Sequence, residues 1–383
     1  MELKQFGEIL ELQRGYDLPS SEMINGGIPV AGSNGIIGYH NIAKVKAPCI
    51  TIGRSGSVGK VHFYDEDIWA HNTSLFVSNF KGNDVKYIYY LLKSKDFAKL
   101  CDSSVVPSLN RNFVYPLKTL FETDVCKQQK IATVLSALDD KIALNRRINT
   151  KLETMAKRLY DYWFVQFDFP NPDGKPYKSS GGKMEYNEVI KREIPAGWEV
   201  KFLGEVCNFP IDRVSEKNIN GKLYVPIEVI PRNEMSFSET ANIEKAASGL
   251  CSFDKRSILL SNRRVYFHKV CIAPFGGITR DTVIIINPED LKNLGFIYQI
   301  VNSNHFIDYA TLNSYGSEQP VLSTPTVQDY KFVYPNNGID KIYSNRIDGI
   351  INKVLENNLE IRKLTAIRNR LLPLLMNGQV EVK

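Results

Sequence analysis

An internal repeat constrains the fold of this chain more than any other feature of its sequence. Short motifs of the first half return in the same order in the second half, and each half leads into a long run with helical periodicity. The repeated pairs are Phe6-Gly7-Glu8 with Leu203-Gly204-Glu205, Ser104-x-x-Pro107-Ser-Leu109 with Ser317-x-x-Pro320-Val-Leu322, and Phe113–Pro116 with Phe332–Pro335. The predicted order is therefore globular, helix, globular, helix. The sequence between these motifs differs widely. The repeat therefore indicates one shared scaffold that holds two divergent modules, each with its own recognition role.

Both long runs have apolar residues at steps of three and four, close to a heptad pattern. The first run, Val125–Phe164, contains no Gly or Pro, and Asp124 is its expected N-cap. A helix of about 38 residues would be ~57 Å long. The second run covers Asp340–Met376, with Asn377-Gly378 as the expected stop. Since helices of this length seldom stand alone, we expect the two to pair.

The globular parts mix short β-rich runs with glycine turns, which predicts an α+β module in each half. The strand-like runs are Cys49–Ile52, Ser74–Val77, Tyr224–Ile227, Ser257–Leu260, Val270–Ala273 and Thr282–Ile286, and a short helix is expected over Val85–Leu100. Residues rich in Pro, Gly, Ser and Lys around 168–197 predict a linker or extended surface segment. The expected divisions are residues 1–123, a helix over 124–167, a linker over 168–199, a second module over 200–338 and a helix over 339–383.

Composition narrows the class of protein only slightly. The chain has 48 Lys and Arg against 42 Asp and Glu, so its formal charge of +6 permits an anionic partner such as nucleic acid without requiring one. The six cysteines show no regular spacing, which favours reduced, buried thiols over disulfides or a zinc site. No apolar run approaches the ~20 residues that span a bilayer, and the N-terminus lacks the pattern of a signal peptide. We therefore expect a cytoplasmic protein without a membrane partner.

Every catalytic signature tested fails. The segment Arg54–Lys60 resembles a phosphate loop, but Arg54 stands where that motif needs Gly and Val61 where it needs Ser or Thr. No G-x-G-x-x-G is present, and the five histidines form no pair with the spacing of metal ligands. There is no Asn-Pro-Pro-Tyr, and Pro288–Lys292 is only a short match to a nuclease site. The sequence predicts neither an enzyme nor a metal protein.

Several motifs resemble those of one known family, and their order and repetition are specific. They are Gly32-Ser-Asn-Gly35-Ile-Ile-Gly38-Tyr, Ile52-Gly-Arg-Ser-Gly56-Ser-Val-Gly59-Lys-Val, His71-Asn-Thr-Ser, Gln128-Gln-Lys-Ile131-Ala, Leu159-Tyr-Asp-Tyr-Trp163-Phe and Leu371-Leu-Pro-Leu-Leu375 with Gly378. Over almost its whole length the chain resembles the specificity subunit of type I restriction-modification systems. In the second half, Cys271–Gly277 is only a poor copy of the Arg-x-Gly-x-x-Gly pattern.

The resemblance implies an α+β fold with two globular α/β target-recognition domains, separated by two long antiparallel coiled-coil helices in a pseudo-twofold internal repeat. It implies that each domain reads one half of a split double-stranded DNA target. It also implies two DNA methyltransferase (modification) subunits and restriction/translocase subunits as partners. S-adenosylmethionine and ATP with magnesium would be cofactors of those partners, so none is expected in this chain.

Polar and basic residues in turns are the candidates for DNA contact, because side chains read base edges while Lys and Arg hold phosphates. In the first half they are Arg54, Ser55, Ser57, Lys60, Asn72, Thr73, Asn110 and Arg111, and in the second half Asn262, Arg263, Arg264, Lys269, Arg280 and Gln319. Ordinary turns, caps and solvated charges are the structural alternatives for these residues. Asn145, Asn149 and Asn358 fall near the expected helix seam, where buried Asn fixes register, or else on its exposed side.

Two other functions stay open from the sequence. One is a non-catalytic coiled-coil adaptor that binds proteins only, and the other is a DNA-modifying enzyme whose site has no recognised motif. Salt dependence of DNA binding separates the adaptor from a DNA reader, since phosphate-mediated binding weakens steeply with salt. Binding of S-adenosylmethionine by the isolated chain would favour the enzyme.

Overall fold

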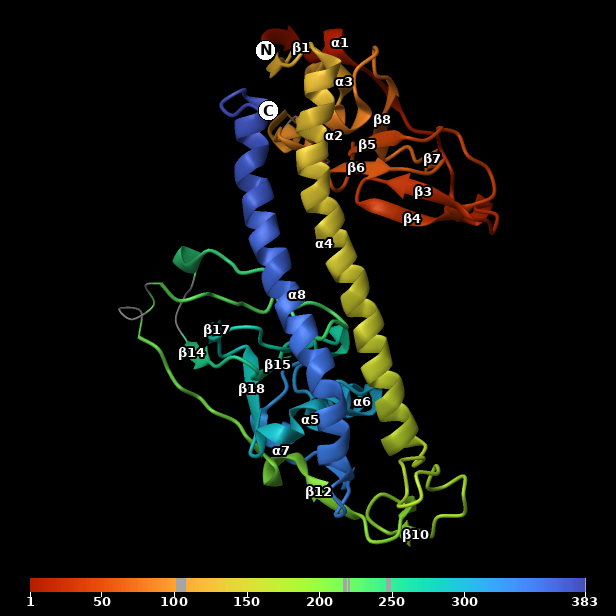
Figure 1. Ribbon diagram of the computed structural model, residues 1–383, viewed down its shortest axis with the longest axis vertical. Coiled ribbons are helices and arrows are strands. Elements are labelled where there is room, and N and C mark those ends of the chain that lie inside the picture. The colour runs from red at the N-terminus through yellow and green to blue at the C-terminus, as the bar shows by residue number, and fades with distance from the viewer. Residues whose placement is uncertain (101–107, 216–218, 220, 246–248, 383) are drawn as a thin grey trace. The chain divides into compact units, whose positions relative to one another are not determined.

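The structure is a computed structural model, and it describes residues 1–100, 108–215, 219, 221–245 and 249–382. The chain divides into two compact units, one formed by Met1–Lys141 with Leu364–Lys383 and the other by Ile142–Lys363. Each unit contains one β-rich module and a stretch of each long helix (Figure 1).

The first unit contains a four-stranded sheet with strand order β2-β8-β5-β6, a three-stranded sheet β4-β3-β7 and the pair β1-β9. Its strands are β1 (Glu2–Gln5), β2 (Glu11–Arg14), β3 (Ile28–Gly32), β4 (Gly35–His40), β5 (Cys49–Gly53), β6 (Val61–Tyr64), β7 (Trp69–Ala70), β8 (Ser74–Asn79) and β9 (Lys118–Phe121). Its short helices are α1 (Phe6–Ile9), α2 (Val85–Lys93) and α3 (Arg111–Val114). Because β1 pairs with β9, the first and last strands of the module close it into one body.

The second unit repeats this plan with the sheet β13-β18-β15-β16 and the pairs β12-β19, β14-β17 and β10-β11. Its strands are β10 (Met184–Asn187), β11 (Arg192–Pro195), β12 (Glu199–Phe202), β13 (Cys207–Asn208), β14 (Leu250–Phe253), β15 (Ile258–Ser261), β16 (Val270–Ile272), β17 (Gly277–Arg280), β18 (Val283–Pro288) and β19 (Lys331–Tyr334). Its short helices are α5 (Leu294–Val301), α6 (Asn304–Leu312) and α7 (Thr324–Gln328).

The topology confirms the internal repeat. Both four-stranded sheets have the same strand order, and in both modules the first strand pairs antiparallel with the last. The Gly-Glu motif makes the same turn twice: Glu8 accepts a hydrogen bond from the Gln5 amide at 2.7 Å, and Glu205 accepts one from the Phe202 amide at 2.6 Å. Duplicated sequence therefore encodes a duplicated local structure.

One of the repeated tetrapeptides is not in structural register. Phe113 and Val114 belong to α3, whereas Phe332 and Val333 belong to β19, whose counterpart in the first module is β9. The prediction that these two tetrapeptides correspond is wrong. Leu109 and Leu322 do correspond, because their amides donate to equivalent carbonyls, those of Arg54 and Asn262. Ser104 and Pro107 of the same motif lie outside the described residues.

The predicted long helices are α4 (Val125–Tyr160), which continues into a π-helical turn over Asp161–Val165, and α8 (Ile339–Met376). Asp124 caps α4 as predicted, since its carboxylate accepts the Cys126 amide at 2.9 Å. After α8, Gly378 has φ +66° and donates to Leu375, which ends the helix where predicted.

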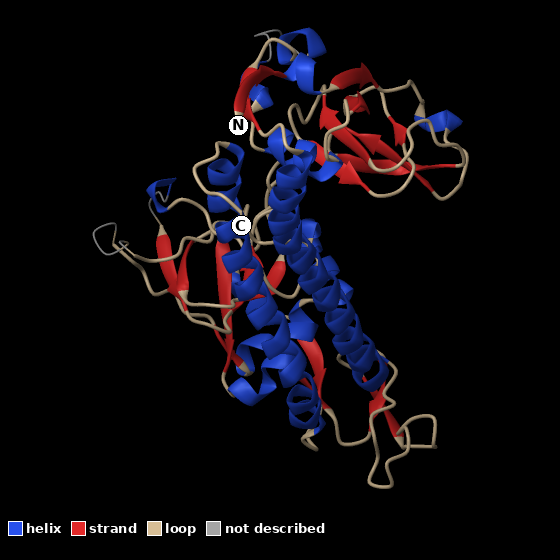
Figure 2. Ribbon diagram, turned by 45° about the horizontal axis from the view of Figure 1, so that its top comes forward, coloured by secondary structure: helices blue, strands red, loops and turns tan. Residues whose placement is uncertain are grey.

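The two long helices pack antiparallel within each unit. In the first unit, Asp139 of α4 accepts from Arg368 of α8 at 2.6 Å, and Leu135 shares a core with Leu372. In the second unit the Tyr343 hydroxyl donates to the Ala156 carbonyl at 2.9 Å. The ribbons of α4 and α8 run side by side within each unit (Figures 1 and 2). The α+β class with paired antiparallel helices is therefore confirmed.

The helix seam of the second unit contains a polar ladder. Asn145 donates to Glu360 at 2.8 Å, and Asn357 donates to Asn149 at 2.8 Å. Asn145, Asn149 and Asn358 are all buried, so the seam position was the correct alternative for these three residues. Asn357 belongs to the same ladder although the sequence pattern did not single it out.

Apolar side chains of the sheets form much of the hydrophobic core of each module. In the second unit Ile258, Leu260 and Ile284 face α5, α8 and α4, while the alternating Leu259 and Ile285 face a second cluster around Phe253. The sheet is therefore buried on both faces, which explains why its strands read as continuous apolar runs. Within the described part of the chain, no helix is long and apolar enough to cross a membrane.

Three local predictions differ from the structure. The helix expected over Val85–Leu100 ends at Lys93, before a short 3-10 turn over Phe97–Leu100. The run at Tyr224–Ile227 is no strand, because Pro226 interrupts it and only Tyr224 forms isolated bridges. The segment expected as an extended linker contains the β10-β11 hairpin and buries Trp198, so it is folded onto the second module.

Four of the cysteines, Cys49, Cys207, Cys251 and Cys271, are buried free thiols as predicted. Cys126 is free but exposed, on the first turn of α4, so the prediction of burial is wrong for it. Cys101 lies outside the described residues.

Candidate nucleic-acid interface

The loop from Gly53 to Lys60 joins β5 to β6 and folds back on itself. The Gly53 amide donates to the Lys60 carbonyl and the Gly59 amide to the Gly53 carbonyl, each at 2.8 Å. A side chain at Gly53 would lie 2.1 Å from the Ser57 carbonyl oxygen, so only glycine fits this position. The exposed Lys60 ammonium donates to Asn34 at 2.6 Å, which joins the loop to the β3-β4 turn.

Arg54, the second residue of that loop, connects three segments that are far apart in the sequence. Its amide donates to the Thr73 carbonyl at 2.8 Å, and its carbonyl accepts from the Leu109 amide at 2.8 Å. The Ser55 amide also donates to Thr73, at 3.2 Å, and Ser55 forms a β-bridge with Ser108. These backbone bonds bring together all three groups of first-half residues that the sequence predicts.

The side chains of Asn72, Thr73 and Asn110 each make a hydrogen bond within the first module. Asn72 donates to Asp17, and the Thr73 hydroxyl lies 2.9 Å from Nδ1 of His71. Asn110 caps α3 by accepting the Asn112 amide at 3.0 Å. The cap expected as the structural alternative for Asn110 is therefore present, and the residue is exposed.

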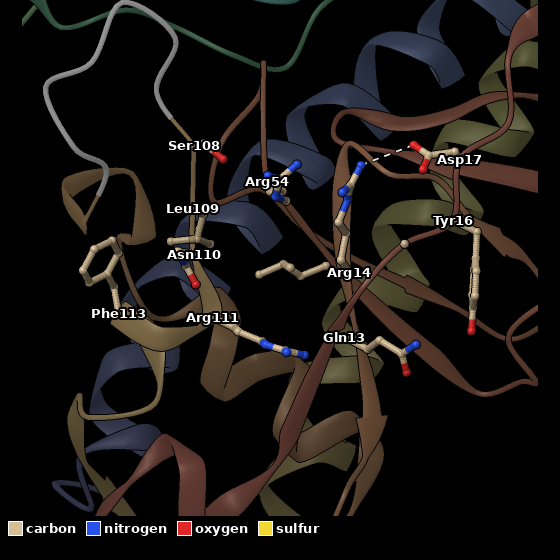
Figure 3. Close-up of a pocket in the computed structure, with 12 residues that line it drawn as sticks. Gln13, Arg14, Tyr16, Asp17, Arg54, Ser108, Leu109, Asn110, Arg111 and Phe113 are labelled. Atoms are coloured by element: carbon tan, nitrogen blue, oxygen red, sulfur yellow. Dashed lines mark hydrogen bonds and ion pairs between the residues drawn. The ribbon is translucent and has the colours of Figure 1, made fainter.

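A cleft of about 780 Å³ opens beside Arg54 (Figure 3). Its walls come from β2 and the turn after it, from the start of the Arg54 loop, and from the segment leading into α3. The lining residues are Gln13, Arg14, Gly15, Tyr16, Asp17, Arg54, Leu75, Ser108, Leu109, Asn110, Arg111 and Phe113. Of the predicted residues, Arg54, Asn110 and Arg111 line it, whereas Ser55, Ser57, Lys60, Asn72 and Thr73 do not.

Three guanidinium groups from three elements line this cleft, against one carboxylate. Arg14 lies 3.3 Å from Asp17, Arg111 donates to the Leu12 carbonyl at 3.1 Å, and Arg54 reaches the Asn72 carbonyl at 3.5 Å. Each guanidinium has five N–H donors, so most of them have no partner among the described residues. The cleft therefore presents net positive charge and donors suited to phosphate or guanine acceptors.

Sequence reasoning missed Gln13, Arg14, Tyr16 and Asp17. In β2 the side chain of Leu12 is buried while Gln13 and Arg14 are exposed, which the apolar pattern allows. No local pattern indicates that Arg14 meets Arg54, because β8 lies between β2 and β5 in the sheet. Its place in the segment after the repeated Gly-Glu motif, seven residues from Gly7, is its sequence signal.

In the second module Asn262 occupies the backbone position of Arg54. Its amide donates to the Thr282 carbonyl at 2.9 Å, and its carbonyl accepts from the Leu322 amide at 2.8 Å. These bonds match those of Arg54 with Thr73 and Leu109. Cys271, expected to begin the poor copy of the glycine pattern, lies in β16 and is not part of this loop.

Arg263 and Arg264 follow Asn262 in the loop and contact the turn that contains Gln319. Arg263 forms a β-bridge with Val321, and the Arg264 amide donates to the Pro320 carbonyl at 3.1 Å. Arg264 and Gln319 are both exposed, and Arg264 has φ +46°. The structure thus brings Arg263, Arg264 and the Gln319 turn together.

Lys269 and Arg280 are more enclosed than the sequence suggested. The Lys269 ammonium donates to the Ile227 carbonyl at 2.6 Å, and burial, with Arg232 nearby, lowers its pKa. Arg280 ends β17, and its Nε is buried without a hydrogen-bond partner among the described residues. Neither side chain is as exposed as Arg14 and Arg111 of the first module.

No group of three or more His, Cys, Asp or Glu side chains that could hold a metal ion occurs among the residues described.

Two modules of one topology, each with a polar loop after the third strand of its sheet, define a two-module recognition protein. The family model described as "Type I restriction modification DNA specificity domain" matches residues 1–154 and 195–365. The chain belongs to this family, whose members are the non-catalytic DNA-recognition components of type I systems.

Known proteins resemble the chain over most of its length. The MjaIX specificity subunit of Methanocaldococcus jannaschii is 25% identical over 78% of this chain and 69% of its own length. The HindI specificity subunit of Haemophilus influenzae is 26% identical over 84% of both chains. The crystal structure of a type I restriction-modification S subunit from M. genitalium matches with a TM-score of 0.60 at 15% identity, over 98% of this chain and 96% of that one. The last match supports the fold alone.

Proposed function

We propose that the chain reads a bipartite sequence in double-stranded DNA, one half-site with each module. The observation that carries this proposal is the shared backbone position of Arg54 and Asn262, which have the same hydrogen-bonded frame and different side chains. A duplicated frame with unlike side chains suits a protein that reads two unlike half-sites in the same way. Membership in a DNA specificity family supports DNA as the ligand.

In the first module, Arg54, Asn110 and Arg111 are the proposed contacts inside the cleft, with Arg14 and Gln13 added from the structure. Side chains of these types donate to base edges or to phosphates. The loop residues Ser55, Ser57 and Lys60, with Asn72 and Thr73, are proposed to hold the adjacent backbone. In the second module the proposed contacts are Arg263, Arg264, Lys269, Arg280 and Gln319.

The proposed partners are two DNA methyltransferase subunits and restriction/translocase subunits. S-adenosylmethionine and ATP with magnesium would be bound by those partners. The proposed location of the assembly is the cytoplasm, because the partners would act on DNA there. The proposed boundaries of the target-recognition domains are residues 1–123 and 200–338. Assembly with other subunits follows from the family, and their number is our proposal.

We further propose that α4 and α8 set the spacing between the half-sites. At 1.5 Å per residue, the 36 residues of α4 span ~54 Å. The polar ladder between Asn149 and Asn357 supports this role, because two buried amides that pair with each other fix the register of two helices. If the register of the two helices is fixed, the length of the helix pair that separates the modules is fixed as well.

The test is methylation mapping in cells that carry this chain with its partner methyltransferase. Exchanging residues 1–123 for the same region of a relative should change one half-site and leave the other unchanged. Exchanging residues 200–338 is the matched control and should change the other half-site. If either exchange altered both half-sites, the proposal that each module determines one half-site independently would be wrong.

The protein-only adaptor makes a different prediction in a binding experiment. A DNA reader should lose affinity steeply between 50 and 200 mM salt, because each phosphate contact adds about −0.9 to the slope of log K against log salt. An adaptor should show no DNA affinity at either concentration. The purified chain alone should show no methyltransferase, ATPase or nuclease turnover above a mock preparation.

A further inference from the structure

The cleft beside Arg54 has a counterpart in the second module, at the same place in the repeated frame. It measures about 80 Å³, and its lining includes Phe209, Pro210, Ile211, Asn262 and Thr324. Asn262 identifies the correspondence, since its backbone bonds match those of Arg54. The two modules therefore offer the same site in two different sizes.

Each of the three cleft arginines has a neutral counterpart. Arg54 corresponds to Asn262. Counting seven residues from Gly7 and from Gly204 pairs Arg14 with Ile211. Arg111 follows the N-cap residue of α3 and Thr324 follows that of α7, which makes this pair equivalent too.

The second-module cleft is also more apolar. Phe209, Pro210 and Ile211 replace Leu12, Gln13 and Arg14 in the segment after the Gly-Glu motif, and Ile211 is 64% exposed. No lysine or arginine lines this cleft among the described residues. The second module's own cations, Arg263 and Arg264, stand at the positions of Ser55 and Gly56, which do not line the first-module cleft.

We infer that the first-module cleft takes an acceptor-rich group of the DNA, either a backbone phosphate or the O6/N7 edge of a guanine, and that the second-module cleft does not. This inference rests on the proposed function and adds a site and its ligand chemistry to it. Three guanidinium groups, most of whose N–H donors have no partner among the residues that the structure describes, match both acceptors. The second-module cleft has no lysine or arginine among its described lining residues and includes one acidic residue, Asp281. An anion there would therefore lose its hydration without compensation.

In the first module, charge-dependent affinity for DNA therefore comes from the arginines of the cleft. In the second module it comes from Arg263 and Arg264 in the loop. This asymmetry gives the two half-sites different chemistry at equivalent positions of one scaffold. It also explains why the two clefts differ although the strands around them share one order.

The experiment measures DNA binding by the full chain in complex with its partner methyltransferase, using fluorescence anisotropy between 50 and 200 mM NaCl. The variants are Arg14→Gln and Arg54→Gln, with Ile211→Gln as the counterpart in the second module. Arg370→Gln removes the same charge from an exposed position on α8 in the first unit and is the matched control. The probes are a 40-base-pair duplex of mixed sequence and one that carries the target found by methylation mapping.

We expect each cleft variant to weaken binding roughly 5- to 10-fold more than Arg370→Gln does. An equal loss on both probes with a shallower salt slope assigns the cleft to a phosphate. A loss confined to the target duplex assigns it to a guanine. Ile211→Gln should leave the salt slope unchanged.

Two outcomes would overturn the inference in distinguishable ways. If the wild-type complex binds the target duplex and both cleft variants behave like Arg370→Gln, the cleft is not the site and the proposed function stands. If the wild-type complex binds neither probe, the proposed function fails together with the inference. Arg14 is exposed and belongs to β2 and not to the Arg54 loop, so its variant tests the site even if Arg54→Gln disturbs the loop.

Discussion

Glu153, on α4, provides the sharpest test of the packing in the second unit. It lines a cleft of about 440 Å³ between the helix seam and the segment around Glu234. Burial raises the pKa of its carboxyl to about 7, against an ordinary 4.5, despite a hydrogen bond from the Met235 amide, and the Glu234 charge raises it further. Arg146 and Asn149 of α4 also line the cleft, while Tyr298 and Gln299 line the neighbouring cleft that shares Glu153.

The raised pKa makes ionised Glu153 destabilising. Between pH 4.5 and 7 the folded chain holds a proton that the unfolded chain has released, so stability falls as pH rises through this window and then levels off. A pKa difference of about 2.5 corresponds to about 3 kcal/mol above pH 7. At pH 5 the same relation gives about 1 kcal/mol.

Glu153→Gln should remove this penalty while keeping an oxygen for the Met235 amide. We expect the variant to raise the unfolding midpoint by roughly 6–12 °C at pH 8.5, at about 2–4 °C per kcal/mol for a unit of this size. At pH 5 the gain should shrink to roughly a third. The assay is thermal unfolding of the full chain followed by circular dichroism at both pH values.

Glu356→Gln, at an exposed position on α8, is the matched control and should change neither midpoint. An equal gain from Glu153→Gln at both pH values would show that ionisation of this carboxyl is not the cause. No gain at pH 8.5 would show that water reaches Glu153 and that the segment around Glu234 does not cover it.

Three further predictions concern the helices. Asp139→Ala should lower the free energy of unfolding by about 2–3 kcal/mol in denaturant titrations, because it leaves Arg368 half-buried without its partner; Asp140→Ala, on the exposed side of α4, should cost under about 0.5 kcal/mol. Asn149→Leu should cost about 1–3 kcal/mol by leaving the Asn357 amide unpaired, and changing both to Leu should restore stability; a double variant as unstable as the single one would contradict this. Seven residues inserted into both long helices, in the second unit beside the polar ladder, should lengthen the target spacer by about three base pairs, since ~10 Å of helix matches ~3.4 Å per base pair; an unchanged spacer in an active variant would mean that the helices are not the ruler.

The fold followed from sequence where one interaction dominates locally. Heptad periodicity over Val125–Phe164 needs only apolar residues at regular steps, and the helix ends lie where Asp124 and Gly378 place them. Strands buried on both faces, such as Ile258–Ser261, were equally clear in the sequence, because a continuous apolar run is typical of a strand that both faces of a sheet shield from water. Tyr224–Ile227 has the same texture and is no strand, since Pro226 cannot donate to a ladder.

The candidate site was predicted in part for the same reason. A glycine-rich turn pointed to Arg54, and the polar run at Asn110–Asn112 pointed to Arg111; both line the first-module cleft. Arg14 was missed because its role depends on a neighbour from another strand. Asn262 and its arginines were found as a charge cluster, but their match to Arg54 shows only in hydrogen bonds between segments that are far apart in the sequence.

By itself the sequence determined that this protein consists of two modules of one design and two long helices, because repeats and periodicity are properties of consecutive residues. Only the tertiary structure decided which residues share a cleft and that equivalent clefts carry different charge. Whether Arg14, Arg54 and Arg111 line one cleft depends on strand order and backbone hydrogen bonds across the sheet. Those long-range pairings form when the whole core is buried, and no stretch of consecutive residues encodes them alone.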